Sequence, residues 1–222
     1  MTHRNTGGRE MSATHDAEAA QLARTPVQSG TGRRICVFCG SSPGNNPAYA
    51  EAAREIGRLI GERGHTLVFG GGAVGLMGEV ARTARSFAAP IIGILPVFLR
   101  GIEPPLKSAE ELIITPDLQQ RKSRMLALAD AFVILPGGLG TLDETLEIIT
   151  WKQLGLHDKP IVLVDVADYW TPLYELFQHC VAAGFAGRGA LRLFRTVTRV
   201  EDVLGALAEA HQPERAPEPK LV

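Results

Sequence analysis

The segment AFVILPGGLGTLDE, residues 131–144, joins an apolar run to a glycine-rich turn and then to a polar helix start. Residues 131–135 are apolar at every position, which is typical of a strand covered on both faces within a parallel sheet. Further short apolar runs occupy residues 35–39, 65–69, 90–95, 111–114, 160–164 and 194–197. We expect each run to form a strand of the same sheet.

Amphipathic stretches separate most of these runs. We expect helices over residues 47–63, 117–130, 141–154, 169–183 and 201–211, with Asn46 and Asp117 as N-caps of the first two. Alternation of strands and helices predicts a single α/β domain with a doubly wound parallel sheet flanked by helices. This body spans residues 33–211, and the polar segments 1–32 and 212–222 are expected to be flexible tails.

The composition excludes several classes of protein. The chain has 222 residues, 45% of them hydrophobic and 21% charged, with a formal net charge of −1. A nucleic-acid or acidic-membrane coat protein would need a basic excess. The sequence contains no apolar run long enough to cross a bilayer and no apolar stretch typical of a signal peptide. Three cysteines are too few for a disulfide scaffold, so we expect a cytoplasmic protein. From its charge and the absence of a long apolar run, we expect that it binds neither nucleic acid nor membrane.

Glycine-rich turns follow the first, second and fifth predicted strands. In a parallel sheet, ligands bind beyond the carboxyl ends of the strands, where glycine lets the backbone approach a phosphate. The candidate phosphate-loop residues are Gly40, Ser41, Gly71, Gly72, Gly75 and Gly137. One such turn alone could be a tight strand–helix connection. Three of them predict a phosphorylated small molecule as ligand, with a nucleotide as the leading candidate.

The fifth-strand turn combines glycines with Thr141, Asp143 and Glu144, and Arg121 and Lys122 precede the same strand. A cleft there could hold a phosphate on one side and a carboxylate on the other. Two structural interpretations compete. The cations could form a solvated helix face, and Thr141-x-x-Glu144 could be a capping box at a helix start.

Other reactive residue types give weaker signals. Cys36 and Cys39 match C-x-x-C, but inside a strand residues three apart point to opposite faces, so we interpret them as core thiols. The histidines show no spacing typical of a metal site. We therefore predict no metal.

Several motifs together resemble the LOG ("Lonely Guy") family of cytokinin riboside 5′-monophosphate phosphoribohydrolases. The resemblance covers roughly residues 34–206. It is carried by Gly70-Gly71-Gly72-x-x-Gly75-Leu76-Met77-Gly78, Arg121-Lys122, Pro136-Gly137-Gly138-x-Gly140-Thr141-x-x-Glu144 and Ile149-Thr150-Trp151-x-Gln153-Leu154-Gly155. One departure is Gln119, which stands where family members often have histidine.

This resemblance implies a Rossmann-like homodimeric hydrolase without an organic cofactor. Its substrate would be an N6-modified adenosine 5′-monophosphate, cleaved at the N-glycosidic bond to free base and ribose 5-phosphate. By motif position, Arg121 and Glu144 would be the catalytic pair. The substrate site would include Glu103, Lys122, Gly138, Leu139, Gly140, Thr141, Leu142, Asp143 and Thr150. The alternative is a nucleotide- or phosphate-binding protein of the same fold without turnover.

Overall fold

A computed structural model describes residues 32–101, 106, 109 and 111–210. The two predicted tails and Glu103 therefore lie outside the described residues, apart from Gly32. The described chain forms one seven-stranded sheet in which every strand pair is parallel. The strands are β1 (Arg34–Phe38), β2 (Thr66–Phe69), β3 (Ile91–Pro96), β4 (Glu111–Thr115), β5 (Ala131–Ile134), β6 (Ile161–Val164) and β7 (Arg195–Val197). Their order across the sheet is β4-β3-β2-β1-β5-β6-β7. All seven predicted strands are confirmed.

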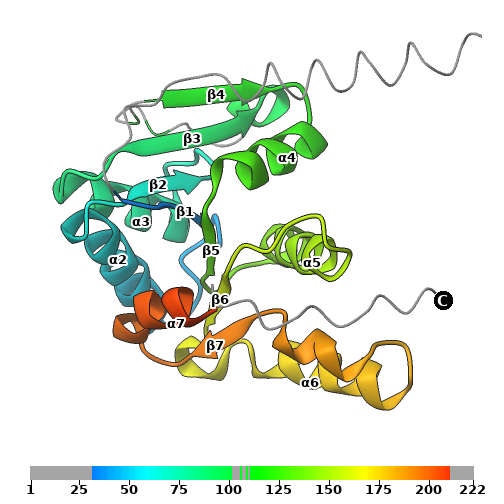
Figure 1. The fold of residues 1–222 in the computed structure, drawn as a ribbon. Coiled ribbons are helices and arrows are strands. Elements are labelled where there is room, and N and C mark those ends of the chain that lie inside the picture. The colour runs from blue at the N-terminus through cyan, green and yellow to red at the C-terminus, as the bar shows by residue number, and fades with distance from the viewer. Residues whose placement is uncertain (1–31, 102–105, 107–108, 110, 211–222) are drawn as a thin grey trace, which may run out of the picture.

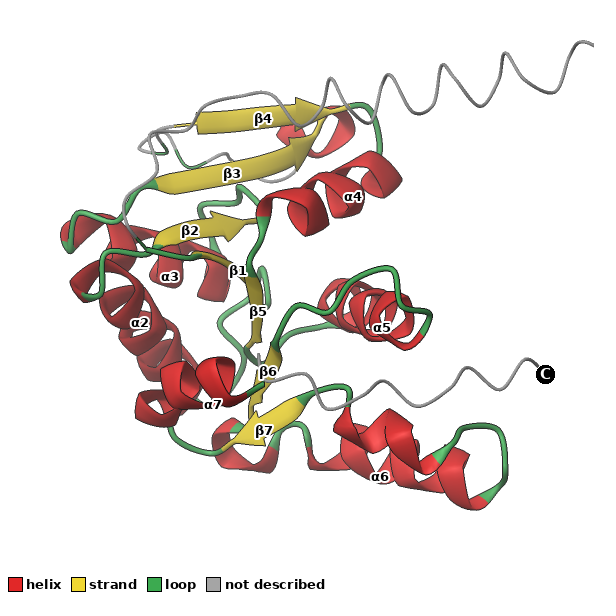
Figure 2. Ribbon diagram, viewed as in Figure 1, coloured by secondary structure: helices red, strands yellow, loops and turns green. Residues whose placement is uncertain are grey.

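Helices cover both faces of this sheet, which confirms the doubly wound fold (Figures 1 and 2). The α-helices are α2 (Pro47–Glu62), α3 (Gly75–Ser86), α4 (Leu118–Leu128), α5 (Leu139–Gln153), α6 (Thr171–Ala182) and α7 (Val203–Glu209). Short 3-10 helices are η1 (Val97–Gly101), η2 (Val166–Asp168), η3 (Arg188–Arg192) and η4 (Val200–Asp202). Helices α2, α3 and α7 pack on one face of the sheet, and α4, α5 and α6 pack on the other.

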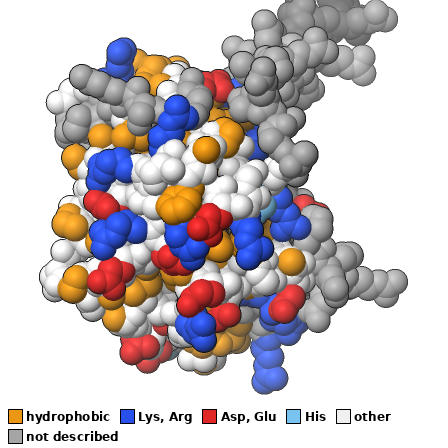
Figure 3. Space-filling view, turned by 90° about the vertical axis from the view of Figure 1, so that its left-hand side faces the viewer, with side chains coloured by type: hydrophobic (Ala, Val, Ile, Leu, Met, Phe, Trp, Pro, Cys, Tyr) orange, Lys and Arg blue, Asp and Glu red, His pale blue; other side chains and the backbone are white. Residues whose placement is uncertain are grey.

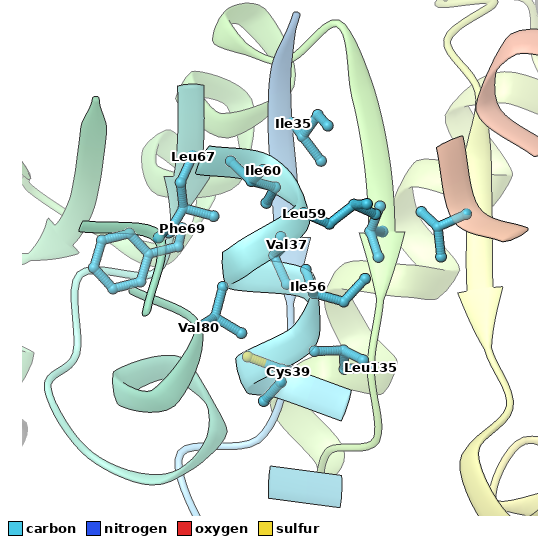
Figure 4. Packing of buried hydrophobic residues seen from close by; sticks show 14 of the residues in the cluster. Ile35, Val37, Cys39, Ile56, Leu59, Ile60, Leu67, Phe69, Val80 and Leu135 are labelled. Carbon is cyan, nitrogen blue, oxygen red and sulfur yellow. The ribbon is translucent and has the colours of Figure 1, made fainter. Parts of the chain in front are cut away.

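Side chains of the inner strands β1, β2, β5 and β6 alternate between two apolar clusters, one on each face of the sheet. In β1, Ile35 and Val37 join the cluster beneath α2 and α3 (Figure 4), while Cys36 and Phe38 join the cluster beneath α4 and α5. Cys39 packs on the side opposite to Cys36. The two buried thiols thus belong to different cores, as predicted, and cannot act as a pair.

Helix boundaries follow local capping chemistry. The side chain of Asn46 accepts a hydrogen bond from the Ala48 N–H, and that of Asp117 accepts one from the Gln120 N–H, which confirms both predicted caps. Helix α3 was not predicted. Its first turn contains Gly75 and Gly78, residues that disfavour a helix in a sequence pattern.

The outer surface of α2 and α3 carries both signs of charge. Arg58 pairs with Glu55 and Glu62 along α2, while Glu79 of α3 pairs with Arg54 of α2. Figure 3 shows this face of the molecule, where basic and acidic side chains lie side by side. Within the described part of the chain, no helix has the length and apolar character needed to span a membrane.

Candidate active site

The site lies where the direction of strand addition reverses. Strands β1 to β4 are added outward in chain order, and β5 then returns to pair with β1. In an open parallel sheet, the crevice beyond the carboxyl ends at such a switch point is the place where ligands bind. The turns that follow β1 and β5 lie at this point, with the turn after β2 beside them.

The three glycine turns touch one another through backbone atoms. The Gly40 N–H donates to the Pro136 carbonyl at 3.0 Å, and a Cβ added to Gly40 would lie 3.4 Å from the Gly137 Cα. Gly75 has a positive φ of 59°, and a Cβ there would lie 2.2 Å from the Ser41 carbonyl carbon. Turn packing therefore requires glycine at position 75, while at Gly40 a Cβ would be tight, 3.0 Å from the Ser42 carbonyl oxygen. These contacts confirm that the three turns lie together at the carboxyl-terminal ends of the strands.

Arg121 of α4 and Glu144 of α5 meet in an ion pair beneath these turns. Arg121 Nη1 lies 2.9 Å from Glu144 Oε1, and the two side chains are only 11% and 10% exposed. Arg121 Nε also donates to the Ile94 carbonyl of β3 at 3.2 Å. The guanidinium is therefore fixed from two sides, and the carboxylate is oriented by it.

Both competing interpretations from the sequence are wrong at these residues. Burial of Arg121 excludes an ordinary solvated face for that cation. Helix α5 begins at Leu139 with Gly138 as its N-cap, so Thr141 lies inside the helix and Glu144 lies in its second turn. A capping box needs Thr141 at the cap position and Glu144 three residues later. The carboxylate instead serves the ion pair with Arg121.

Lys122 faces a second pair of carboxylates on α5. Its ammonium lies 3.0 Å from Asp143 Oδ2 and 3.1 Å from Glu147 Oε2. Burial disfavours the charged lysine, but the hydrogen bonds to Asp143 and Glu147 outweigh this effect and raise the pKa of Lys122. Lys122 is therefore a cation that ties α4 to α5 next to the Arg121–Glu144 pair.

The electrostatic effect of Glu144 reaches the two core thiols. Burial raises the pKa of Cys36 and Cys39 well above the ordinary range, and the charge of Glu144 raises both further. Thiols in this state are protonated at neutral pH and are not nucleophiles. The chemistry of the site therefore rests on carboxylate, guanidinium and backbone groups.

The remaining predicted residues fall into two places. Gly138, Leu139 and Gly140 are exposed around the first turn of α5, and Asp143 is also exposed. Thr141 and Leu142 follow them, with Thr141 buried. Thr150 lies six residues beyond Glu144, about 9 Å further along the helix axis, where its hydroxyl donates to the Leu146 carbonyl.

Four residues of the site were not among the site residues predicted from the sequence. A Cβ on Gly70 would lie 2.2 Å from Arg121 Nη2, so this glycine makes room for the guanidinium. The Ile94 carbonyl binds Arg121, Glu147 binds Lys122, and Tyr169 donates to the Gly137 carbonyl. Only the glycine run around Gly70 was visible as a pattern. Among the described residues, no cluster of histidine, cysteine, aspartate or glutamate side chains could hold a metal ion.

Solved structures with the same fold include the molybdenum cofactor binding protein from the phototrophic bacterium Rippkaea orientalis. It is 22% identical in sequence, with a TM-score of 0.63 over 82% of this chain and 98% of that protein. The molybdenum cofactor carrier protein from Chlamydomonas reinhardtii gives a TM-score of 0.61 at 20% identity, covering 81% of this chain and 98% of that protein. At these identities the comparison shows the fold alone.

Sequence relatives are closer. A probable cytokinin riboside 5′-monophosphate phosphoribohydrolase, LOGL1 of Oryza sativa subsp. japonica, is 44% identical over 75% of each chain. The cytokinin riboside 5′-monophosphate phosphoribohydrolase LOG7 of Arabidopsis thaliana is 41% identical over 82% of this chain and 83% of its own. The family model described as "possible lysine decarboxylase" matches residues 77–207. The chain therefore belongs to the LOG family, which this family model represents.

Proposed function

We propose that the protein hydrolyses the N-glycosidic bond of adenosine 5′-monophosphates, including N6-modified ones, to release the free base and ribose 5-phosphate. The names of its relatives support this activity. The observation that carries it is the nearly buried Arg121–Glu144 pair at the switch point of the sheet. A protein that only binds a nucleotide would not require a carboxylate held in this way.

Glu144 is the group that stabilises the reaction. Cleavage of an N-glycosidic bond develops positive charge on the ribose ring, as in other glycosidases. A carboxylate beside C1′ stabilises that charge and orients the attacking water. Arg121 holds the carboxylate at 2.9 Å, so its orientation is set before the substrate arrives.

Backbone N–H groups of the glycine turns bind the 5′-phosphate of the substrate. The first N–H groups of α5 have no acceptor within the helix and can therefore bind an anion. The residues that carry them are exposed: the N-cap Gly138 and the first two helical residues, Leu139 and Gly140. Phosphate bound there would anchor the ribose above Glu144. Binding energy from the phosphate, which does not react, then holds the reacting bond in place.

A pyridoxal phosphate decarboxylase, which the family model's description would suggest, does not fit these residues. Such an enzyme needs a lysine that forms a Schiff base through its neutral amine. Lys122 at the site has a raised pKa because two carboxylates bind its ammonium. The other described lysines are Lys152, at the end of α5, and Lys159, just before β6. Both lie near the amino-terminal ends of the strands, on the opposite side of the sheet from the glycine turns.

We also propose that the protein is a cytoplasmic homodimer. Apolar side chains on and after α5 reach the surface, with Leu146 40%, Leu154 66% and Leu156 66% exposed next to the half-buried Trp151. A second copy of this chain would cover them. Light scattering at micromolar concentration tests the proposal, and a monomeric mass would refute it.

The test of activity is chromatographic. Wild-type protein is incubated with adenosine 5′-monophosphate and with isopentenyladenosine 5′-monophosphate, and the free base is quantified. The matching nucleosides serve as controls, because a site built around a phosphate should cleave them far more slowly. Release of base from neither nucleotide would favour the alternative, a nucleotide-binding protein without turnover. Equal rates for nucleotide and nucleoside would refute the phosphate requirement.

A further inference from the structure

A tyrosine outside the family motifs holds the backbone of the glycine turn after β5. Tyr169 lies between η2 and α6, in the connection that follows β6, the strand next to β5. Its hydroxyl donates a hydrogen bond to the carbonyl of Gly137. The next residue, Gly138, is the N-cap of α5. A side chain from one connection therefore fixes a peptide group of the neighbouring one.

The ring of Tyr169 is held by two other aromatic side chains. It packs edge-to-face against Tyr49 of α2, with ring centroids 5.6 Å apart, and against Trp170 at 4.9 Å. Such pairs stabilise a defined ring orientation. The direction of the hydroxyl is thus set by packing and is independent of any ligand.

The connection that carries Tyr169 is itself held in a strained conformation. Ala167 and Asp168 have positive φ angles of 53° and 57°, a region that residues other than glycine rarely adopt. Asp165 at the end of β6 accepts hydrogen bonds from the Trp170 N–H at 2.6 Å and from the Thr171 hydroxyl at 3.3 Å. Strain of this kind persists where surrounding contacts impose it, and it gathers at functional sites.

The hydrogen bond determines which way the Gly137–Gly138 peptide faces. In a planar trans peptide the C=O and N–H bonds point in opposite directions. With its carbonyl bound to Tyr169, the Gly137–Gly138 peptide turns the Gly138 N–H away from the tyrosine. Since both residues lack a Cβ, this peptide could otherwise rotate at low cost. A rotated peptide would present an oxygen where the N–H now stands.

We propose that Tyr169 is a positioning residue for phosphate binding, an inference that rests on the proposed function. By holding the Gly137 carbonyl, it keeps the Gly138 N–H among the donors at the start of α5 that bind the 5′-phosphate. A phosphate gains a hydrogen bond from the N–H in this orientation and is repelled by the carbonyl oxygen in the other. Tyr169 does not touch the bond that breaks.

The experiment compares Tyr169→Phe with wild type by calorimetric titration. The variant keeps the ring and its aromatic contacts but removes the hydroxyl. Ribose 5-phosphate is one ligand, since it carries the phosphate and has no N-glycosidic bond to break, and adenosine is the other. We expect affinity for ribose 5-phosphate to fall roughly tenfold and affinity for adenosine to stay within about twofold. Tyr174→Phe, which removes a hydroxyl from α6, is the matched control and should match wild type for both ligands.

The outcomes separate this proposal from the proposed function. Unchanged affinity of Tyr169→Phe for ribose 5-phosphate would overturn it, and so would an equal loss for adenosine, which would indicate a general structural defect. A melting temperature within about 4 °C of wild type shows that the fold is kept. If wild type binds ribose 5-phosphate but releases no base from nucleotides, hydrolysis is refuted while the titration still decides the role of Tyr169. Failure of wild type to bind ribose 5-phosphate would overturn the positioning role together with the phosphate site.

Discussion

The guanidinium of Arg121 occupies the space that a side chain on Gly70 would need. A Cβ built on Gly70 would lie 2.2 Å from Arg121 Nη2 and 3.0 Å from Met77 Sδ. The absence of a side chain at the end of β2 is therefore what allows Arg121 to reach Glu144.

Gly70→Ala should fold and lose activity. The displaced atoms are the ends of flexible side chains, so the fold can yield, but Arg121 must leave its position beside Glu144. A displacement of about 1 Å in a catalytic group can cost roughly a hundredfold in rate, and we expect a fall in kcat of ten- to about a hundredfold. Steady-state kinetics and circular dichroism measure the two effects.

Gly205→Ala in α7 is the matched control, since a Cβ there meets nothing within 4 Å. Alanine also favours the helix over glycine by about 1 kcal/mol. This variant should therefore keep full activity. Wild-type kinetics in Gly70→Ala would show that the position of Arg121 is not critical.

Glu144→Gln should abolish most turnover with the fold intact. Glutamine still offers an oxygen to Arg121, but it cannot stabilise a cationic ribose by charge or act as a base toward water. We expect kcat to fall by roughly two orders of magnitude or more. Affinity for ribose 5-phosphate should persist, because the glycine turns are untouched.

Glu147→Gln tests whether any lost carboxylate on α5 has the same effect. Glu147 is also ion-paired, to Lys122 at 3.1 Å, and lies three residues from Glu144. Its loss should change kcat by less than about tenfold. Equal losses in the two variants would contradict a special role for Glu144.

Gly137→Ala and Gly138→Ala should differ in stability although they are neighbours. A Cβ on Gly137 would lie 2.1 Å from Thr141 Oγ1 and 2.8 Å from the Gly40 nitrogen, whereas one on Gly138 meets nothing within 4 Å. We expect Gly137→Ala to lose about 1–3 kcal/mol of unfolding free energy. Gly138→Ala, at an exposed position with φ of −87°, should stay near wild type. Denaturant titration measures both, and similar values would refute the packing of the two turns.

Stability should decrease as the pH falls below neutrality. Burial lowers the pKa of His65 and His157 below their ordinary value of 6.5, and neighbouring cations lower both further. The unfolded chain therefore binds protons more readily than the folded one, so the stabilisation is full above pH 6.5 and is lost as the pH falls toward the folded pKa values.

Melting temperatures measured between about pH 8 and pH 5 test this dependence. A variant with both His65→Gln and His157→Gln should show a flatter profile over the same range. An identical slope in wild type and variant would assign the dependence to other groups.

The sequence was sufficient for the five inner strands because they are mostly apolar and buried on both faces. The edge strands β4 and β7 are more exposed and were predicted from shorter runs. The sequence failed at α3, because Gly75 and Gly78 in the first turn make the sequence look like a loop. Glycine is needed at position 75 because the residue packs against Ser41, a contact that the sequence does not reveal. The sequence also placed the start of α5 two residues late, because its N-cap, Gly138, offers no side-chain signal.

At the site, the motif pattern identified Arg121 and Glu144, which the structure brings together. The sequence could not identify Gly70 or Tyr169 in the same way. Gly70 matters because of an arginine 51 positions later, and Tyr169 matters because of a carbonyl 32 positions earlier. Contacts at such separations depend on the order of strands in the sheet, which no local pattern contains.

That strand order gives the Arg121–Glu144 pair one more consequence. Arg121 belongs to the part of the chain before β5, Glu144 belongs to the part after it, and the two parts join in the sheet through the pairing of β1 with β5. A chain divided after Asp130 would place the two charges on separate polypeptides. Neither fragment could turn over substrate alone, and a mixture could do so only after β5 had docked beside β1. In such a fragment-complementation experiment, the appearance of enzymatic activity would report when the two halves of the sheet have assembled.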